Sequence, residues 1–304
     1  MVKLSILLLT RNGERDLQRL LPALFQQKTE KSFEVIAIDS SSTDGTLDLL
    51  SRYPVRIERI PAEQFHHART RNLAATLASG EILVFLSQDA VPATSLWLDA
   101  LVSSFADPTV AGVYGRQFPK PESSVERQHA MDAVYGDQKL VKDPANGNRM
   151  GYRFYHFSDA NAAIRRTAWE AVRFPEELKV FEDLGIAKRL LDRGWKIVYE
   201  PDAAVFHSHH HTTVGLFKRY FDIGYTLKLL EIWDAPGTKQ SMVRDVCKLV
   251  KGKVQRVGPS HRRKSAGHGI GQDIAKSLGI FLGLNQNCLP LLVKRRLSAY
   301  RVFE

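Results

Sequence analysis

The chain has 304 residues, of which 44% are hydrophobic and 25% charged, a composition that excludes disordered and fibrous proteins. Its net charge of +10 is concentrated near the end, because residues 239–304 contain 14 Lys and Arg against 3 Asp and Glu. No apolar run approaches the roughly 18 residues of a membrane-spanning helix. The two cysteines, Cys247 and Cys288, are too far apart for a CxxC pair, which favours a reducing compartment.

The first ninety residues alternate between short apolar runs and amphipathic stretches. Strands are predicted at residues 3–9, 33–38 and 81–86, because each run is short, aliphatic and bounded by polar turn residues. The first run is followed at once by Arg11 and Asn12, which suits a buried strand better than a signal peptide. Helices are predicted between these strands, at residues 16–27, 43–51 and 67–78. The alternation predicts an α/β fold with a parallel sheet and right-handed crossovers.

The later part of the chain is less regular. A helix is predicted at residues 183–192, ended by Gly194, and further strands at residues 196–199 and 203–207. From Val214 on the pattern becomes helical and then basic, with a linker-like break rich in Gly, Pro and Ser at residues 258–271. A domain boundary is therefore expected near residue 215.

The residues that follow each predicted strand are the first candidates for a site, since open α/β sheets bind ligands at the carboxyl ends of their strands. Residues 10–14 follow the first strand, and residues 39–45 follow the second. The third ends in Ser-Gln-Asp at residues 87–89. Asp39 and Asp89 are expected to meet at one edge of the sheet.

Some of these patterns also have plain structural interpretations. Taken alone, residues 39–45 read as a strand-to-helix turn with Thr43 or Asp44 as the helix N-cap, and it is the expected convergence with Asp89 that favours a site. Glycine-rich residues 267–271 resemble a phosphate loop, but no strand precedes them and a linker is the better interpretation. Dinucleotide cofactors and P-loop chemistry are therefore not expected.

Several separate motifs occur in one order over residues 2–213: S-I-L-L-L-T-R-N, V-I-A-I-D-S-S-S-T-D-G-T, A-R-T-R-N-L-A-A, A-S-G-E-I-L-V-F-L-S-Q-D-A, F-E-D-L-G-I-A-K-R-L-L-D-R-G-W and F-H-S-H. Together they resemble the family 2 glycosyltransferases with the GT-A fold. The stretches F-H-H-A-R-T-R-N and F-K-R-Y-F-D-I-G look most like bacterial rhamnosyltransferases that use dTDP-rhamnose.

The resemblance implies a mixed, mostly parallel sheet flanked by helices, with a catalytic domain over residues 1–215. Its nucleotide-binding half would span about 1–115 and its acceptor half about 116–215, and residues 216–304 would form a helical, basic extension. The implied activity is inverting transfer of a sugar, L-rhamnose from dTDP-rhamnose, to a saccharide or lipid-linked saccharide in bacterial surface polysaccharide synthesis.

The resemblance also implies a divalent cation, Mg²⁺ or Mn²⁺, because departure of a diphosphate requires a cation or fixed positive groups. The family's usual motif is D-x-D, whereas here Gln88 is neutral and only Asp89 is acidic, so the cation would be held more weakly or largely by the phosphates. His207 matches a position that often carries a metal-binding His, and His209 would share its face if the strand continues. Without a metal, this segment would be a solvated polar turn.

Asp183 resembles the family's catalytic base, which takes the proton of the acceptor hydroxyl. Glu182 is the neighbouring acid that could be confused with it. The alternative reading is that Asp183 only stabilises the start of a helix, where an acidic side chain contributes about 0.3 to 1 kcal/mol.

Substrate contacts are implied for a further set of polar residues. Arg71 lies on a predicted helix. The alternative to a substrate contact is that its charge is exposed and has no partner. Gln88 would bond the ribose or the sugar, and the acceptor would lie near Asp159 and Asn161. The nucleotide would be contacted by Thr10, Arg11, Asn12, Glu14, Asp39, Ser41 and Arg71.

Other functions remain to be weighed against this one. A non-catalytic, nucleotide-sugar-binding membrane adaptor would explain the reduced Q-D motif and the basic C-terminal region. No nucleic-acid partner is expected, because the basic residues are not interleaved with stacking aromatics. The basic end and the apolar face of residues 217–233 predict docking at an anionic membrane, at the inner face of a bacterial cell membrane, for an otherwise cytoplasmic protein. The alternative is that this apolar face packs on the catalytic domain.

Overall fold

The computed structural model describes residues 3–121, 123, 131, 134–146, 150–209, 211–240 and 263–303. The chain divides into two compact units. The first comprises Met1–Ala145, Phe157–Glu177 and Glu182–Ser208, and the second comprises Asn146–His156, Leu178–Phe181 and His209–Glu304. Cys247 and the first part of the expected linker, residues 258–262, lie outside the described residues, and Cys288 is an exposed free thiol.

The first unit is built on one sheet, which contains nine strands among the described residues, in the order β3-β2-β1-β4-β8-β6-β9-β5 with β7 paired to β9. The strands are β1 (Leu4–Thr10), β2 (Phe33–Asp39), β3 (Val55–Arg59), β4 (Ile82–Ser87), β5 (Val91–Pro92), β6 (Val110–Phe118), β7 (Leu140–Lys142), β8 (Asn161–Arg165) and β9 (Lys196–Phe206). Strands β1 to β4 are parallel, β8 runs antiparallel between β4 and β6, and β6 is parallel to β9. This is the mixed, mostly parallel sheet that was expected.

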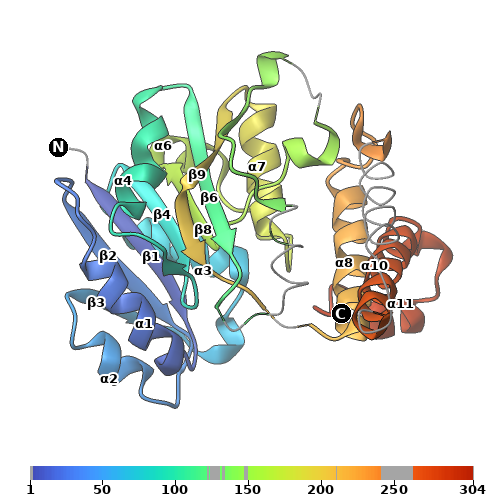
Figure 1. Ribbon diagram of the computed structural model, residues 1–304, viewed down its shortest axis with the longest axis horizontal. Coiled ribbons are helices and arrows are strands. Elements are labelled where there is room, and N and C mark those ends of the chain that lie inside the picture. The colour runs from blue at the N-terminus through green and yellow to red at the C-terminus, as the bar shows by residue number, and fades with distance from the viewer. Residues whose placement is uncertain are drawn as a thin grey trace. The chain divides into compact units, whose positions relative to one another are not determined.

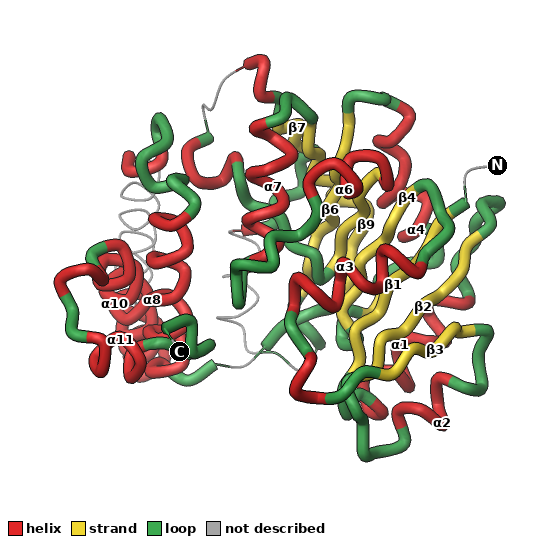
Figure 2. Tube along the Cα trace, turned by 180° about the vertical axis from the view of Figure 1, so that it is seen from behind, coloured by secondary structure: helices red, strands yellow, loops and turns green. Residues whose placement is uncertain are grey.

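Helices cover both faces of this sheet (Figures 1 and 2). One face carries α1 (Glu14–Phe25), α2 (Thr46–Leu50) and α4 (Trp97–Val102). The other carries α3 (His67–Leu77), α6 (Arg166–Val172) and α7 (Glu182–Asp192). Short 3-10 turns lie at η1 (Ala62–Gln64), η2 (Ser103–Ala106) and η3 (Pro144–Asn146).

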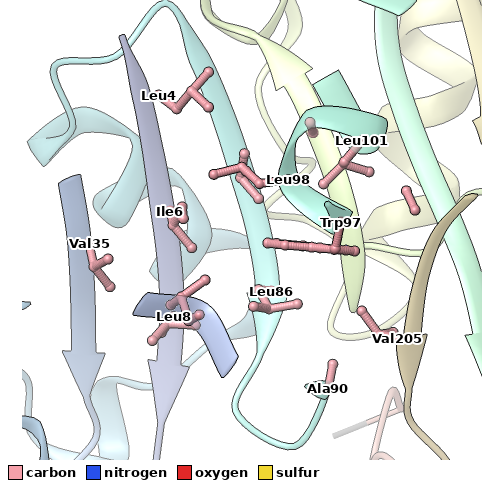
Figure 3. Close-up of a cluster of buried hydrophobic side chains, with 14 of the residues drawn as sticks. Leu4, Ile6, Leu8, Val35, Leu86, Ala90, Trp97, Leu98, Leu101 and Val205 are labelled. Atoms are coloured by element: carbon pink, nitrogen blue, oxygen red, sulfur yellow. The ribbon is translucent and has the colours of Figure 1, made fainter. Parts of the chain in front are cut away.

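Because both faces are covered, the central strands are apolar on both sides. Alternate residues of β1, among them Leu4, Ile6 and Leu8, join the cluster that also contains Trp97 of α4 (Figure 3). On the opposite face Phe85 of β4 meets Phe174 edge to face, with ring centroids 5.0 Å apart. These two layers hold the strand ends, and therefore the site, in fixed register.

The three strands and four helices predicted in residues 3–192 are confirmed to within three residues of their ends. The N-cap of α2 is Gly45 rather than Thr43 or Asp44, although Asp44 Oδ1 accepts a hydrogen bond from Thr46 N at 3.0 Å. Residues 196–206 form one strand, β9, where two were predicted. Between the two predicted strands lies Pro201, where the pairing of β9 with β6 shifts register, because proline cannot donate a ladder hydrogen bond.

The second unit is helical in its described part, with α8 (Thr213–Leu229), α10 (Arg263–Leu284), α11 (Leu291–Leu297) and the 3-10 turns η4 (Gly151–Phe154) and η5 (Gln286–Cys288). Helices α8 and α10 pack closely: a Cβ at Gly283 would lie 2.0 Å from the carbonyl oxygen of Phe221. None of the described helices is both long and apolar enough to cross a bilayer.

Two expectations for this unit are corrected. From Arg263 onward the expected linker is helical, because packing against α8 outweighs the low helix propensity of its glycines. The apolar face predicted to meet a membrane or the catalytic domain is partly used inside the unit, since Phe221 and Leu227 are buried and the centroid of the Phe221 ring lies 5.8 Å from that of Phe303.

Candidate active site

One edge of the sheet gathers the predicted site residues. Strands β1, β2, β4, β6 and β9 all end at this edge, and β8 begins there because it runs antiparallel. Asp39 therefore lies at the same edge as the Gln88–Asp89 segment that follows β4, and His207 directly follows β9. The convergence that was expected from the strand ends alone is observed.

At the mouth of β1 and β2 the polar side chains bond mainly to one another. Asp39 is fully buried, and its carboxylate accepts from Thr10 Oγ1 at 3.1 Å and from the backbone N of Ser42 at 2.9 Å. Asn12 Oδ1 accepts from Thr43 N at 2.8 Å, and Glu14 Oε2 accepts from Gly45 N at 3.1 Å. These bonds shape the loops that would receive a nucleotide.

Ser41 lies beside a shallow depression at the ends of β2 and β3. Its backbone has a φ of +60°, and its Oγ donates to the carbonyl oxygen of Ile60 at 3.0 Å. The depression is lined by Ser41 and by residues 59–63.

Gln88 is bonded to the backbone of the loop after β1. Its Oε1 accepts from Arg11 N at 3.0 Å, and its Nε2 donates to Arg11 O at 3.2 Å. Gly13 allows this approach, since a Cβ there would lie 2.4 Å from Gln88 Oε1. The neutral amide thus joins the ends of β1 and β4, while the Arg11 side chain stays exposed.

Asp89 and His207 face each other across the edge. His207 is 8% exposed, and its Nε2 lies 3.3 Å from Asp89 Oδ1. Gln117, on β6, donates from Nε2 to Ser158 Oγ at 2.8 Å, which turns its Oε1 toward His207 Nδ1 at 2.9 Å. Because a carbonyl oxygen only accepts, Nδ1 carries the proton, and the lone pair of Nε2 is directed at the carboxylate.

Two electron-rich atoms at this distance require a positive species between them, either a proton or a metal ion. Two ligand atoms on adjacent sites of an octahedral cation, each about 2.1 Å from it, lie about 3 Å apart, and the observed separation is 3.3 Å. A carboxylate with an imidazole held by an outer hydrogen bond is a common ligand arrangement. Asp89 and His207 can therefore hold a divalent cation. His209 is part of the second unit and stays a predicted ligand.

A second group of charged side chains, the acidic cluster, consists of Arg71, Asp159, Glu182 and Asp183. Arg71 is only 9% exposed, and its guanidinium bonds Asp159 at 2.7 Å and Glu182 at 2.8 Å. His67 Nδ1 lies 3.8 Å from the same Glu182 oxygen. Arg71 is therefore neither an exposed charge nor a group left available for a phosphate.

The acidic cluster alters the proton affinity of its carboxyl groups. Burial raises the pKa of Asp159 to about 6, although the neighbouring Arg71 opposes this shift. Burial, followed by the negative charges of Asp159 and Glu182, raises the pKa of Asp183 well above its ordinary value. Asp183 Oδ1 accepts from Leu184 N at 2.7 Å, which fixes the carboxyl at the start of α7. A partly buried carboxylate with a raised pKa is suited to act as a general base.

Similarity to known proteins identifies the family. The family model Glycosyl transferase family 2 matches residues 5–173. The chain belongs to this family. The O-antigen chain rhamnosyltransferase WbaN of Salmonella anatum is 34% identical over 288 residues, covering 92% of this chain and 88% of WbaN. RfbN of Salmonella typhimurium, another O-antigen chain rhamnosyltransferase, is 32% identical over 312 residues, covering 99% and 96%.

The fold of this glycosyltransferase also matches a solved structure. A mannosyltransferase from Pyrobaculum calidifontis, in complex with GDP-Man and Mn²⁺, superposes with a TM-score of 0.61 at 17% identity, covering 91% of this chain and 86% of that one. The expected GT-A fold is therefore confirmed. The non-catalytic adaptor is not favoured, because both relatives are named as transferases.

One predicted acceptor-binding residue of the glycosyltransferase is used inside the protein. Asn161 is fully buried, its Nδ2 donates to Ala203 O at 2.7 Å, and its Oδ1 accepts from Trp97 Nε1 at 2.9 Å. It joins β8, β9 and α4, and we assign it a structural role.

Two polar residues of the site, Gln117 and Lys120, were not predicted from the sequence. Gln117 lies near the end of β6 and Lys120 lies two residues after it, and β6 was not predicted because glycines interrupt its apolar run A-G-V-Y-G-R-Q-F. Recognition of that strand would have directed attention to the residues at its carboxyl end.

Proposed function

We propose that the enzyme transfers L-rhamnose from dTDP-rhamnose to a saccharide or lipid-linked saccharide, with inversion at the anomeric carbon, during synthesis of a bacterial surface polysaccharide. The observation that carries this proposal is the similarity to two O-antigen chain rhamnosyltransferases over nearly the whole chain. The arrangement of Asp89, His207 and the acidic cluster supports it. The donor would lie along the edge of the sheet.

The nucleoside would lie in the depression beside Ser41, with the loops ordered by Asp39, Asn12 and Glu14 around it. The diphosphate would lie near Asp89 and His207. A Mg²⁺ or Mn²⁺ ion bound there would neutralise charge on the departing diphosphate. Lipid-linked and free acceptors would present the same hydroxyl to the enzyme.

Asp183 would take the proton from that hydroxyl as its oxygen attacks the anomeric carbon. Its raised pKa makes it a stronger base than an ordinary aspartate, whose pKa is about 3.9. Arg71 and Asp159 would position Glu182 and Asp183 at the start of α7, since the Arg71 guanidinium bonds two carboxylates that are distant in sequence. This positioning role replaces the predicted contact between Arg71 and the nucleotide.

A panel of nucleotide-sugars tests the donor. With Mg²⁺ or Mn²⁺ present, calorimetry and nucleotide-release assays should show binding and slow hydrolysis of dTDP-rhamnose in preference to UDP-GlcNAc, GDP-mannose and UDP-glucose. The same titrations with free dTDP, UDP and GDP separate recognition of the base from recognition of the sugar. Preferential turnover of a UDP- or GDP-sugar would overturn the proposed donor.

The proposal also includes reversible docking on an anionic membrane through α11. Leu291 and Leu292 are 52% and 73% exposed, and Arg295 and Arg296 are exposed on the same side of this helix. We call these four residues the α11 surface. Leucines beside arginines suit the headgroup region of a bilayer, where each basic residue contributes about 1 kcal/mol at low salt.

Co-sedimentation with liposomes tests this docking. Binding should rise with the content of anionic lipid, fall with added salt, and decrease in the double variants Leu291→Ser/Leu292→Ser and Arg295→Gln/Arg296→Gln. Leu96→Ser is the matched control, since Leu96 is a 59% exposed leucine of the first unit. Equal binding to neutral and anionic vesicles would contradict electrostatic docking, and so would full binding by both double variants.

A further inference from the structure

Lys120 lies at the edge of the sheet that carries Asp89 and His207. It follows β6 by two residues, and its backbone N donates to Ser208 Oγ at 3.1 Å. The backbone N of His207 in turn donates to Phe118 O at 2.8 Å. The loop that carries Lys120 is therefore bonded to the segment that carries His207, and the two have a fixed relation.

The ammonium group of Lys120 contacts the carboxylate that is proposed to bind the cation. Its Nζ lies 3.2 Å from Asp89 Oδ2 and 3.5 Å from Asp16 Oδ1 of α1. The other oxygen, Asp89 Oδ1, faces His207. The Lys120 side chain is 21% exposed, so it is held by these contacts and still accessible from solution.

The charges around Asp89 and Asp16 favour an incoming anion once a divalent cation is bound. Gln88 contributes no charge, and its amide is occupied by the backbone of Arg11. Asp89 is the one acidic group of the Asp89–His207 pair, and the single positive charge of Lys120 offsets part of the negative charge of Asp89 and Asp16. A cation added here would give the site a net positive charge beside a lysine, which is an arrangement that binds phosphate groups.

We infer that Lys120 binds the diphosphate of the donor and stabilises it as it departs. This inference rests on the proposed transfer from a nucleoside diphosphate sugar and adds a group that contacts its phosphates. Gln88 stands where the family's motif has a second carboxylate, so the cation would be held less tightly. The ammonium group of Lys120 would supply part of the positive charge that the diphosphate requires. Its contribution persists when no divalent cation is bound.

A purely structural role for Lys120 makes different predictions. In that case Lys120 would only bridge α1 to the end of β4 through Asp16 and Asp89. Asp16→Ala removes this bridge but keeps the ammonium group beside Asp89. A structural bridge therefore predicts the same loss in Asp16→Ala as in Lys120→Met, whereas phosphate binding predicts a loss only in Lys120→Met.

Calorimetric titration of the full chain with dTDP, dTMP and thymidine, in Mg²⁺ and in EDTA, decides between the two roles. In Lys120→Met the Kd for dTDP should rise about tenfold or more in both buffers, as expected for loss of a charged hydrogen bond. Thymidine binding and the midpoint of unfolding should not change. Lys120→Arg should restore most of the affinity, and Lys31→Met, which removes a lysine 2.9 Å from Asp99, is the matched control.

Equal affinity of wild type and Lys120→Met for dTDP would overturn the inference and leave the proposed function intact. An equal loss of dTDP and thymidine binding, or the same loss in Asp16→Ala, would overturn it in favour of the structural bridge. If the wild type bound none of dTDP, UDP and GDP, both the inference and the proposed function would fail. If another nucleoside diphosphate bound in place of dTDP, the comparison would be made with that nucleotide and its nucleoside, and only the proposed donor would fail.

Discussion

The variant Asp183→Asn should lose about 10²- to 10⁴-fold in the rate of sugar transfer, the range that general base catalysis contributes. An amide cannot accept the proton of the acceptor hydroxyl. Folding should be preserved, because the Asn Oδ1 can still accept the hydrogen bond from Leu184 N. Donor binding should be close to normal, since Asp183 is proposed to act on the acceptor hydroxyl and not on the nucleotide. Steady-state kinetics with calorimetry of dTDP binding check this result.

The pH profile gives a second readout of the same assignment. Asp183 must be ionised to act as a base, and its pKa is raised. The wild-type kcat should therefore fall, as the pH is lowered, at a higher pH than an ordinary aspartate would cause. The groups that act on Asp183 include Asp159 before β8, Glu182 on α7 and Arg71 on α3, and Asp183 in turn acts on the buried Tyr135. Glu182→Gln removes a negative neighbour, so its acid limb should move to lower pH.

Two results would contradict this role for Asp183. Loss of donor affinity with an unchanged kcat in Asp183→Asn would make Asp183 a binding residue. An acid limb that stays at the same pH in Glu182→Gln would show that the titrating group lies outside the acidic cluster.

The variants Asp89→Ala and His207→Ala should each abolish most of the effect of divalent cations on dTDP binding. Loss of outer hydrogen-bond partners costs about 10- to 100-fold in metal affinity, and loss of a ligand should cost at least as much. The measurement is calorimetry with dTDP in Mg²⁺, in Mn²⁺ and in EDTA. Binding in EDTA should differ less between His207→Ala and the wild type than binding in Mg²⁺, because no cation is then available to be held.

Gln117→Leu is an informative companion to these two variants. It keeps both ligands but removes the acceptor that places the proton of His207 on Nδ1. The metal effect should decrease by less than in His207→Ala. If all three variants showed the same metal effect as the wild type, the cation would not be held by Asp89 and His207.

The ends of the predicted strands located the site well. Strands β1, β2 and β4 are mostly apolar because helices cover both faces of the sheet. The ends of these strands, and the polar residues that follow them, could therefore be recognised in the sequence. The family resemblance then favoured Asp183 as a base over an ordinary helix-start acid, and this role stays a prediction. The structure adds the reason for its raised pKa, which is burial, followed by the negative charges of Asp159 and Glu182.

Other features depend on contacts that sequence spacing does not reveal. Arg71 is 88 positions from Asp159 and 111 from Glu182, so its burial between two carboxylates could not be read from the helix that carries it. Asn161 lies in a polar segment that suggested acceptor binding, yet its partners come from α4 and β9. Lys120 was missed for a related reason, because β6 was not recognised as a strand.

The most direct test of the account is the rate at which dTDP is released from dTDP-rhamnose by the wild type and by Asp183→Asn, measured side by side with Mg²⁺ and an acceptor saccharide. The account predicts acceptor-stimulated release by the wild type and a rate at least about 100-fold lower in the variant, with equal affinity of both proteins for dTDP. Equal rates of release by the two proteins, or no release from dTDP-rhamnose by the wild type while another nucleotide-sugar is consumed, would contradict it.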